Sequence, residues 1–168
     1  MILRYRKAHP DDIDEICNLV SSAIDTMEEN HIFQWDELYP TRKDFLEDID
    51  KEQLYVGLFN KQIAVVYALN QECDEQYENG KWKYKNEPFY VVHRLCVNPV
   101  FQNKGIARST LLNIETELKK KDIHVIRLDA FQNNPFAIRL YDSLGYSKVG
   151  YADWRKGRFH LMEKYIIE

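Results

Sequence analysis

The chain has 168 residues, of which 45% are apolar, 13% aromatic and 30% charged, and its formal net charge is −4. A domain of this length buries roughly 70% of the surface that its unfolded chain exposes, and this composition excludes a disordered protein. The negative charge argues against nucleic acid or an anionic membrane as the main partner, since both require a basic surface. We therefore expect one globular domain over residues 1–168.

The cysteine spacing and the length of the apolar runs indicate which cellular compartment and which kinds of metal or disulfide site to expect. Cys17, Cys73 and Cys96 are odd in number and lack a CxxC spacing, so we expect neither a disulfide framework nor a metal site. The chain shows no signal-peptide pattern and no apolar run of 18 residues. We expect a cytoplasmic protein that is neither exported nor inserted in a membrane, and the sequence leaves a homodimer open.

The first forty residues predict a strand, a helix and an irregular connection. Residues 2–8 (ILRYRKA) form the expected strand, and apolar side chains then recur at helical spacing from Ile13 to Met27. The aromatic-rich segment 31–40 (HIFQWDELYP) is too irregular for a helix or a strand. We expect this segment to act as a lid.

A second short helix follows the aromatic segment. Thr41 and Asp44 resemble a capping box, and the helix that they open is expected to turn Phe45, Leu46 and Ile49 inward.

A hairpin and a long polar segment come next. The apolar runs 54–59 and 63–69 flank Asn60-Lys61, a pattern typical of a β-hairpin. The polar segment 71–88 predicts a long loop or a hairpin extension, without a domain boundary.

The second half alternates strands and helices. It predicts strands at 89–97 and 124–131 and a closing hairpin of 146–152 with 158–166. One helix runs through Ala107, Leu111, Ile114 and Leu118, and another spans about 134–144, between Pro135 in its first turn and Gly145 at its end. A central parallel strand pair with antiparallel neighbours and helices on the faces is an α+β fold with a mixed sheet.

The junction 101–112 (FQNKGIARSTLL) starts a helix directly after a small polar loop. Helix N-termini bind anions where the backbone can be approached closely, and Gly105 removes the side chain at that point. Lys104 and Arg108 add positive charge, and Gln102 and Asn103 offer donors. The spacing is neither a Walker loop nor a dinucleotide fingerprint, so an ordinary helix start is an alternative to a phosphate site.

Two segments together carry a family resemblance. Residues 97–112, followed after one strand by 134–146 (NPFAIRLYDSLGY), resemble the GNAT family of N-acetyltransferases. The hallmark of that family is Arg/Gln-x-x-Gly-x-Gly/Ala and then Asn-x-x-Ala-x-x-x-Tyr-x-x-x-Gly-Phe/Tyr. The resemblance is close over residues 89–150, with Ala107 where many members have glycine.

This resemblance implies an acetyl-CoA enzyme with a mostly antiparallel sheet and a splayed parallel strand pair. The loop and first helical turn would bind the pyrophosphate, the strand at 95–97 would pair its backbone with the pantetheine arm, and Asn134 would touch CoA. The implied cofactor residues are Leu95, Cys96, Val97, Gln102, Asn103, Lys104, Gly105, Ile106, Ala107, Arg108 and Asn134.

The resemblance also implies catalytic roles. Tyr141 shares a helical face with Ala137 and is either a core tyrosine or, as in the family, the general acid for the CoA sulfur. His93 is either a core histidine or, as in arylalkylamine acetyltransferases, the base for the amine. Asp129 and Glu87 are further candidates for the base.

Cys96 and His93 are not expected to form a nucleophilic pair. Close neighbours on a strand point to different faces, so core packing explains Cys96 better.

The aromatic segment is the expected acceptor site. Trp35 and Tyr39, with Asp36 and Glu37, fall where the family caps its acceptor pocket, and aromatic rings with carboxylates suit a cationic amine. A buried aromatic cluster is the alternative.

We predict an acetyl-CoA-dependent N-acetyltransferase that acts by direct attack of a small-molecule primary amine, without a metal. A protein lysine or N-terminal amine is the alternative acceptor. A non-catalytic acyl-CoA-binding module is the alternative of another class.

Overall fold

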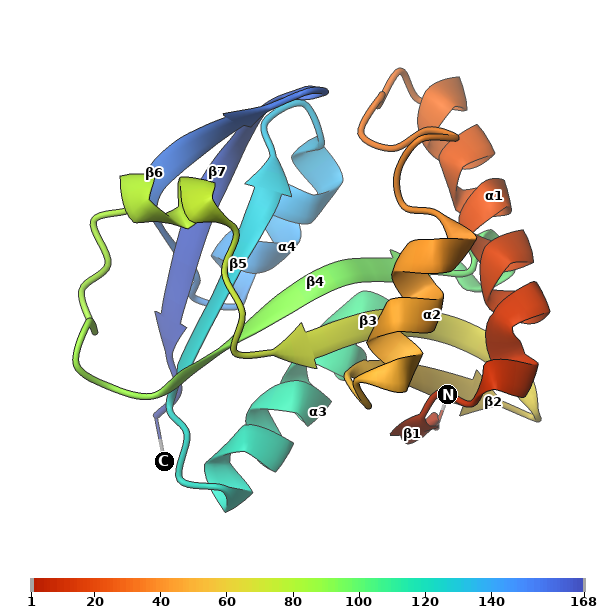
Figure 1. Ribbon diagram of the computed structural model, residues 1–168, viewed down its shortest axis with the longest axis horizontal. Coiled ribbons are helices and arrows are strands. Elements are labelled where there is room, and N and C mark those ends of the chain that lie inside the picture. Colours follow the sequence, from red (N-terminus) through yellow and green to blue (C-terminus); the bar gives the residue numbers. More distant parts are fainter. Residues whose placement is uncertain (1, 168) are drawn as a thin grey trace. The chain divides into compact units, whose positions relative to one another are not determined.

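A computed structural model of the protein describes residues 2–167 (Figure 1). Three of its helical elements, labelled η, are short 3-10 helices. In chain order the elements are β1 (Arg4–Lys7), η1 (Pro10–Asp12), α1 (Ile13–Glu29), α2 (Arg42–Asp50), β2 (Leu54–Phe59), β3 (Gln62–Asn70), η2 (Glu75–Asn79), β4 (Phe89–Val97), η3 (Pro99–Phe101), α3 (Ile106–Lys120), β5 (Val125–Phe131), α4 (Pro135–Ser143), β6 (Ser147–Trp154) and β7 (Gly157–Tyr165).

The strands form a seven-stranded sheet in the order β1-β2-β3-β4-β5-β7-β6. β4 and β5 are parallel and pair through the first three residues of each strand, whereas β1–β2, β2–β3, β5–β7 and β6–β7 are antiparallel. This mixed sheet with four α-helices confirms the predicted α+β fold class.

The chain divides into two compact units. Unit 1 comprises residues 1–69 and 93–110, and unit 2 comprises residues 70–92 and 111–168. β4 and α3 contribute residues to both units. The single domain expected from chain length stays a prediction.

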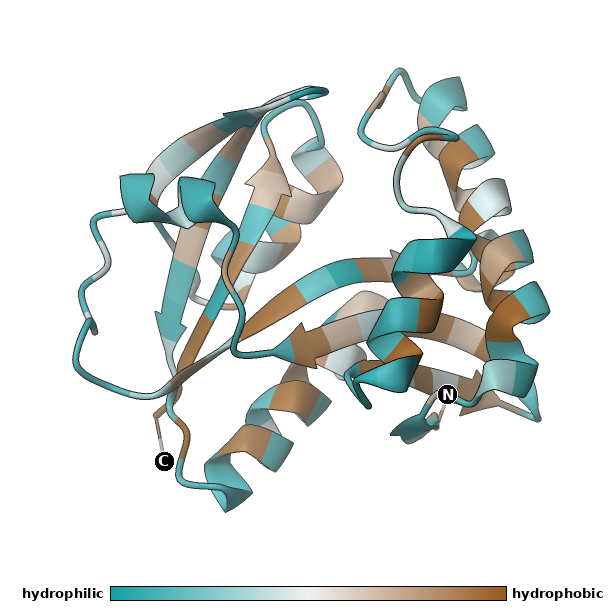
Figure 2. Cartoon of the chain, viewed as in Figure 1, coloured by the Kyte–Doolittle hydropathy of each residue, from teal (hydrophilic) through white to brown (hydrophobic). Residues whose placement is uncertain are grey.

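Unit 1 is built around α1, α2 and the strands β1 to β3. The apolar side of α1 buries Ile16, Leu19 and Val20, and Figure 2 shows apolar and polar residues alternating along this helix. The predicted capping box opens α2, where the Asp44 amide donates to Thr41 Oγ1 (3.3 Å). This box satisfies amides that a helix start leaves unpaired.

The β2–β3 hairpin and the orientation of α2 can each be compared with its prediction. The predicted β2–β3 hairpin is confirmed, with Asn60 and Lys61 at φ +48° and +71°, as a tight primed turn requires. Phe45 and Ile49 are buried as expected, but Leu46 is 39% exposed. The inward orientation predicted for Leu46 is wrong, because the buried side of α2 consists of Phe45, Asp48 and Ile49.

Unit 2 holds β5, α4 and the β6–β7 hairpin. Asn134 caps α4 by accepting a hydrogen bond from the Ala137 amide (3.1 Å), and Pro135 is its first residue, as expected. Gly145 follows the helix with φ +90°, a conformation that favours glycine. The sequence therefore located both ends of α4 within one residue.

The polar segment 71–88 contains the short helix η2 rather than only loop. Asp74 starts η2 by accepting a hydrogen bond from the Gln76 amide (2.9 Å). Tyr77 and Trp82 are buried in the core of unit 2 together with Val91, Ala152 and Leu161. Two aromatic side chains therefore fold this largely hydrophilic segment (Figure 2) onto the sheet.

Candidate active site

The candidate cofactor loop of unit 1 leads from β4 into α3. Asn98 holds its start, since its amide donates to the Ala64 carbonyl (2.8 Å) and its side chain donates to the Ile63 carbonyl (3.1 Å). The Asn98 side chain also accepts a hydrogen bond from the Val100 amide (3.1 Å). Sequence reasoning missed this residue, although the Asn-Pro pair after an apolar strand is a turn signal.

The backbone conformation at position 105 favours glycine. Gly105 has φ +72°, and a Cβ placed there would meet no atom within 4 Å. The position therefore faces open space, and any side chain would extend into the volume in front of this backbone. The Gly105 carbonyl accepts the Ser109 amide (3.0 Å), which begins the hydrogen bonding of α3.

The first turn of α3 is anchored on its inner side. Ile106 is buried with Phe101, Ala64 and Val65, and fully buried Thr110 lies 3.1 Å from the Tyr5 hydroxyl. These contacts fix the direction in which α3 begins.

The outer side of the same junction presents polar groups. Gln102, Asn103, Lys104 and Arg108 are exposed, Ala107 is half-buried, and Asn103 also has a positive φ of +60°. The first amides of a helix have no partner within the helix and carry a partial positive charge. Together with two cationic side chains they form a site that suits a phosphate group, and the open space at Gly105 fits its approach.

The strand that precedes the loop has two distinct faces. Half-buried Leu95 and Val97 pack with Phe101 and Ile106, whereas Cys96 lies in the other core cluster of unit 1, with α1 residues. Burial raises the pKa of the Cys96 thiol to about 12. Cys96 is therefore a neutral packing residue, in agreement with its expected lack of a nucleophilic role.

A strained residue interrupts β4. Arg94 has φ +52°, a conformation that is rare for residues other than glycine, so the regular alternation assumed for half-buried His93 is broken at the next position. The Arg94 guanidinium donates to both carboxylate oxygens of Asp48 on α2 (2.9 and 2.7 Å) and to the Tyr39 hydroxyl (3.0 Å). Burial raises the pKa of Asp48, and the nearby Arg94 opposes this.

The two predicted acceptor residues lie in different environments of unit 1. Trp35 is buried in the core with α1 and α2 residues, whereas Tyr39 is 40% exposed and held by Arg94. Asp36 and Glu37 line a cavity of about 540 Å³ together with residues of α1 and α2. The acceptor roles of Trp35 and Tyr39 stay predictions, with Tyr39 the more accessible of the two.

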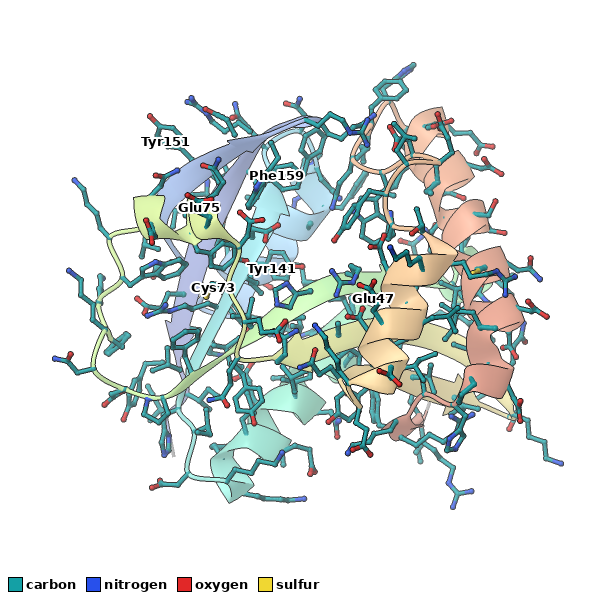
Figure 3. The ribbon with its side chains drawn as sticks, viewed as in Figure 1. Glu47, Cys73, Glu75, Tyr141, Tyr151 and Phe159 are labelled. Carbon is teal, nitrogen blue, oxygen red and sulfur yellow. The ribbon has the colours of Figure 1, made fainter. Side chains whose placement is uncertain are left out.

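The candidate acid lies in unit 2. Tyr141 on α4, labelled in Figure 3, is 8% exposed, and its ring packs edge-on against Tyr146 at 5.8 Å. Burial, and then the charge of Asp129, raise the pKa of the Tyr141 phenol above its ordinary value. The Tyr141 phenol is therefore neutral at physiological pH, and Asn134 lies at the start of the same helix.

Asp129 on β5 is a further candidate, since its charge acts on Tyr141. Its carboxylate accepts a hydrogen bond of 2.6 Å from the buried Tyr77 hydroxyl. The sequence offered Asp129 only among the secondary candidates, because a single carboxylate in a strand has no spacing that marks it.

Two features are absent from residues 2–167. No group of three or more His, Cys, Asp or Glu side chains there could hold a metal ion, and no helix in that range is long and apolar enough to cross a membrane.

Comparisons with known proteins relate the chain to acetyltransferases. Residues 20–146 match the profile of the Acetyltransferase (GNAT) family. The [Ribosomal protein bS18]-alanine N-acetyltransferase of Haemophilus ducreyi is 34% identical over 59 residues, which are 35% of this chain and 41% of that protein. The match thus spans less than half the length of this relative.

Solved structures share the fold. A GNAT-family acetyltransferase from Streptococcus agalactiae superposes with a TM-score of 0.86 at 23% identity, covering 99% of this chain and 96% of that one. The PaiA N-acetyltransferase of Thermoplasma acidophilum, solved in complex with coenzyme A, gives a TM-score of 0.71 at 17% identity, with 98% and 99% covered.

Proposed function

Because this chain belongs to the Acetyltransferase (GNAT) family, we propose that it moves an acetyl group from acetyl-CoA to a primary amine. The observation that carries this proposal is the start of α3, where Gly105 leaves open space in front of helix amides, between Lys104 and Arg108. A relative in fold, the PaiA enzyme, was solved with coenzyme A, which supports the same cosubstrate here.

Residues 102–108 would hold the CoA pyrophosphate. Their amides and the two cations neutralise its charge, while Leu95–Val97 would offer backbone groups to the pantetheine arm. Acetyl-CoA supplies a thioester whose carbonyl carbon a neutral amine can attack. No metal is needed for this exchange, since the thiolate is already a good leaving group.

Tyr141 is the proposed general acid. A phenol has a pKa near 10 in water, and burial raises the pKa of this one further, so its hydroxyl is protonated at neutral pH. This hydroxyl would donate a hydrogen bond to the sulfur as the C–S bond breaks and would pass its proton to the departing thiolate in that step. A protein that only binds acyl-CoA has no use for this donor, so Tyr141 favours catalysis over a sensing module.

Of the three candidates for the general base, Glu87 is exposed, whereas His93 and Asp129 are half-buried. His93 is the base that the family resemblance implies, and it lies half-buried next to the strained Arg94. Asp129 is favoured by its electrostatic effect on Tyr141 and by the hydrogen bond from Tyr77, which favours the ionised carboxylate. We propose Asp129 as the base and retain His93 as the rival.

The acceptor is proposed to be a small cationic amine, drawn by the acidic chain and by the carboxylates near Tyr39. A second candidate is the N-terminal amine of a protein. The names of the matched relatives, which act on an alanine of ribosomal protein bS18, favour this second candidate.

One experiment tests the proposed function. Thiol release from acetyl-CoA would be measured against a panel of small amines, lysine-containing peptides and peptides with an N-terminal alanine, and calorimetry would measure acetyl-CoA binding. We expect binding together with thiol release for at least one amine class. Binding without release on any of them would favour the sensing module, and absence of binding would refute the proposal.

A further inference from the structure

The segment 71–88 places one buried hydroxyl group against the candidate site of unit 2. Tyr77 on η2 is 3% exposed, and its hydroxyl donates a hydrogen bond of 2.6 Å to Asp129 Oδ2. The two residues are 52 positions apart in the sequence. A charge-assisted hydrogen bond of this length is among the stronger ones in proteins.

The ring of Tyr77 is held rigidly. It stacks on Trp82 with 5.6 Å between ring centroids, and the Trp82 indole N–H donates to the Tyr77 carbonyl (2.7 Å). A Cβ on Gly80 would lie 2.5 Å from the Trp82 ring, so glycine is needed to let the segment fold back on itself.

The segment is also tied to the sheet of unit 2. The Lys81 amide donates to the Val149 carbonyl (2.7 Å), and the Lys83 amide donates to the carboxylate of Glu163 (2.9 Å). The Arg127 guanidinium lies 4.4 Å from the Trp82 ring centroid. These contacts come from β5, β6 and β7, so Tyr77 is presented by an ordered segment.

We propose that Tyr77 is a positioning residue of the acetyl transfer, because its hydroxyl fixes the orientation of the Asp129 carboxylate and favours its ionised form. The proposal rests on the function proposed above, in which Asp129 accepts the proton that the amine loses and Tyr141 gives one to sulfur. Burial, with the negative charge of Asp129, raises the pKa of Tyr77 well above its ordinary value, so Tyr77 donates the hydrogen bond at every physiological pH.

Other titratable and charged groups surround Tyr77 and Asp129, and they stay the same in the test. Besides burial, the charge of Asp129 raises the pKa of Tyr141 on α4. Arg127 lies two residues before Asp129, on the same face of β5. Two further titratable groups lie nearby: Cys73, which interacts with Arg127 and Tyr77, and Glu163 on β7, which lies 3.9 Å from Arg127. None of these groups changes in the variant proposed here.

The test compares Tyr77→Phe with Tyr84→Phe. Tyr84 belongs to the same segment, but its ring packs on Tyr165 at 5.0 Å, so this variant repeats the chemical change away from Asp129. Tyr77→Phe keeps the ring and its stacking. We expect kcat/KM for the amine to fall about 10- to 100-fold, as the loss of a hydrogen bond to a charged group would cause, while acetyl-CoA affinity and melting temperature stay near wild type.

The pH profile separates positioning from a structural role. Without the hydroxyl, Asp129 takes up a proton at higher pH, so the acidic limb of kcat/KM should move up by about one pH unit in Tyr77→Phe and stay in place in Tyr84→Phe. A double-mutant cycle combines Tyr77→Phe with Asp129→Asn. In the Asp129→Asn background, Tyr77→Phe should cause no further loss of kcat/KM, because the carboxylate through which Tyr77 acts is already gone.

Titration of the Asp129 side chain by carbon NMR gives a readout that needs no activity. An Asp129 titration that is the same in wild type and Tyr77→Phe would overturn the proposal, whether or not acetyl transfer occurs. Additive effects in the cycle would overturn it as well. Absence of acetyl transfer by the wild-type protein would refute the proposed function, while the NMR titration would still decide whether Tyr77 controls Asp129.

Discussion

At the scale of single residues, the neutral state of Tyr141 is the property on which the proposed chemistry depends. A tyrosine in water would be a weak acid with a pKa near 10, and burial beside Asp129 raises that pKa. The same helix face that packs Tyr141 into unit 2 therefore also keeps its hydroxyl protonated. Packing and catalysis are compatible roles for this side chain.

Tyr141→Phe should lower kcat by roughly one to three orders of magnitude, within the range for a lost proton donor, and leave acetyl-CoA affinity nearly unchanged. Tyr146→Phe is the matched control, because the Tyr146 ring contacts Tyr141 and its buried hydroxyl has no hydrogen-bond partner among residues 2–167. Measuring kcat and melting temperature on the same preparations separates the two roles. Full turnover by folded Tyr141→Phe, with chemistry limiting the rate, would remove Tyr141 as the acid.

At the scale of elements, the junction of β4, η3 and α3 combines a rigid inner side with an open outer side. Asn98 and Ile106 fix the backbone on the inside, and Gly105 keeps the outside free. A change at Gly105 should therefore act on ligand binding more than on the core of unit 1.

Gly105→Glu should raise the Kd for acetyl-CoA by at least about 100-fold, because it adds bulk and a negative charge where the pyrophosphate would lie. Gly105→Gln is the control of equal size without the charge, and it shares the backbone strain of roughly 1–2 kcal/mol at φ +72°. We expect a smaller loss of affinity for Gln, measured by calorimetry. Wild-type affinity in the Glu variant would exclude this loop as the phosphate site.

The aromatic segment 31–40 makes a second element-scale prediction. Tyr39→Ala should raise the acceptor KM with little loss of stability, since Tyr39 is 40% exposed. Trp35→Ala should instead reduce the free energy of unfolding by about 3–5 kcal/mol, because it empties a core position. Steady-state kinetics and urea unfolding of both variants check this. An unchanged acceptor KM in Tyr39→Ala would leave the segment a structural role only.

At the scale of the whole molecule, buried phenols make stability depend on alkaline pH. Burial raises the pKa of Tyr77, Tyr141 and Tyr146 in the folded state. All three belong to unit 2. Above a pH of about 10 the unfolded chain loses these protons while the folded chain keeps them, so the free energy of unfolding falls as pH rises.

Each such tyrosine should contribute a slope of up to about 1.4 kcal/mol per pH unit between its unfolded and folded pKa. We expect urea unfolding at a pH of about 11 to show this loss relative to a pH of about 8. Tyr146→Phe should reduce the slope by the share of one tyrosine, because a phenylalanine has no proton to lose. An identical slope in Tyr146→Phe and wild type would contradict the assignment.

The sequence by itself determined the local structure and the family. The sequence was sufficient to predict the helix starts at Thr41 and Asn134, the Asn60-Lys61 turn and the two GNAT segments. Caps, turns and loop motifs depend on residues close together in the chain. Gly105 was identified for the same reason.

Only the tertiary structure decided which distant side chains meet. The sequence contains no spacing that joins Tyr77 to Asp129 or Arg94 to Asp48, since these pairs are 52 and 46 positions apart. The exposure of Leu46, the burial of Trp35 and the strain at Arg94 were likewise decided by packing. Burial and long-range pairing are properties of the folded chain, so they set which polar residues become partners and which phenols keep their protons.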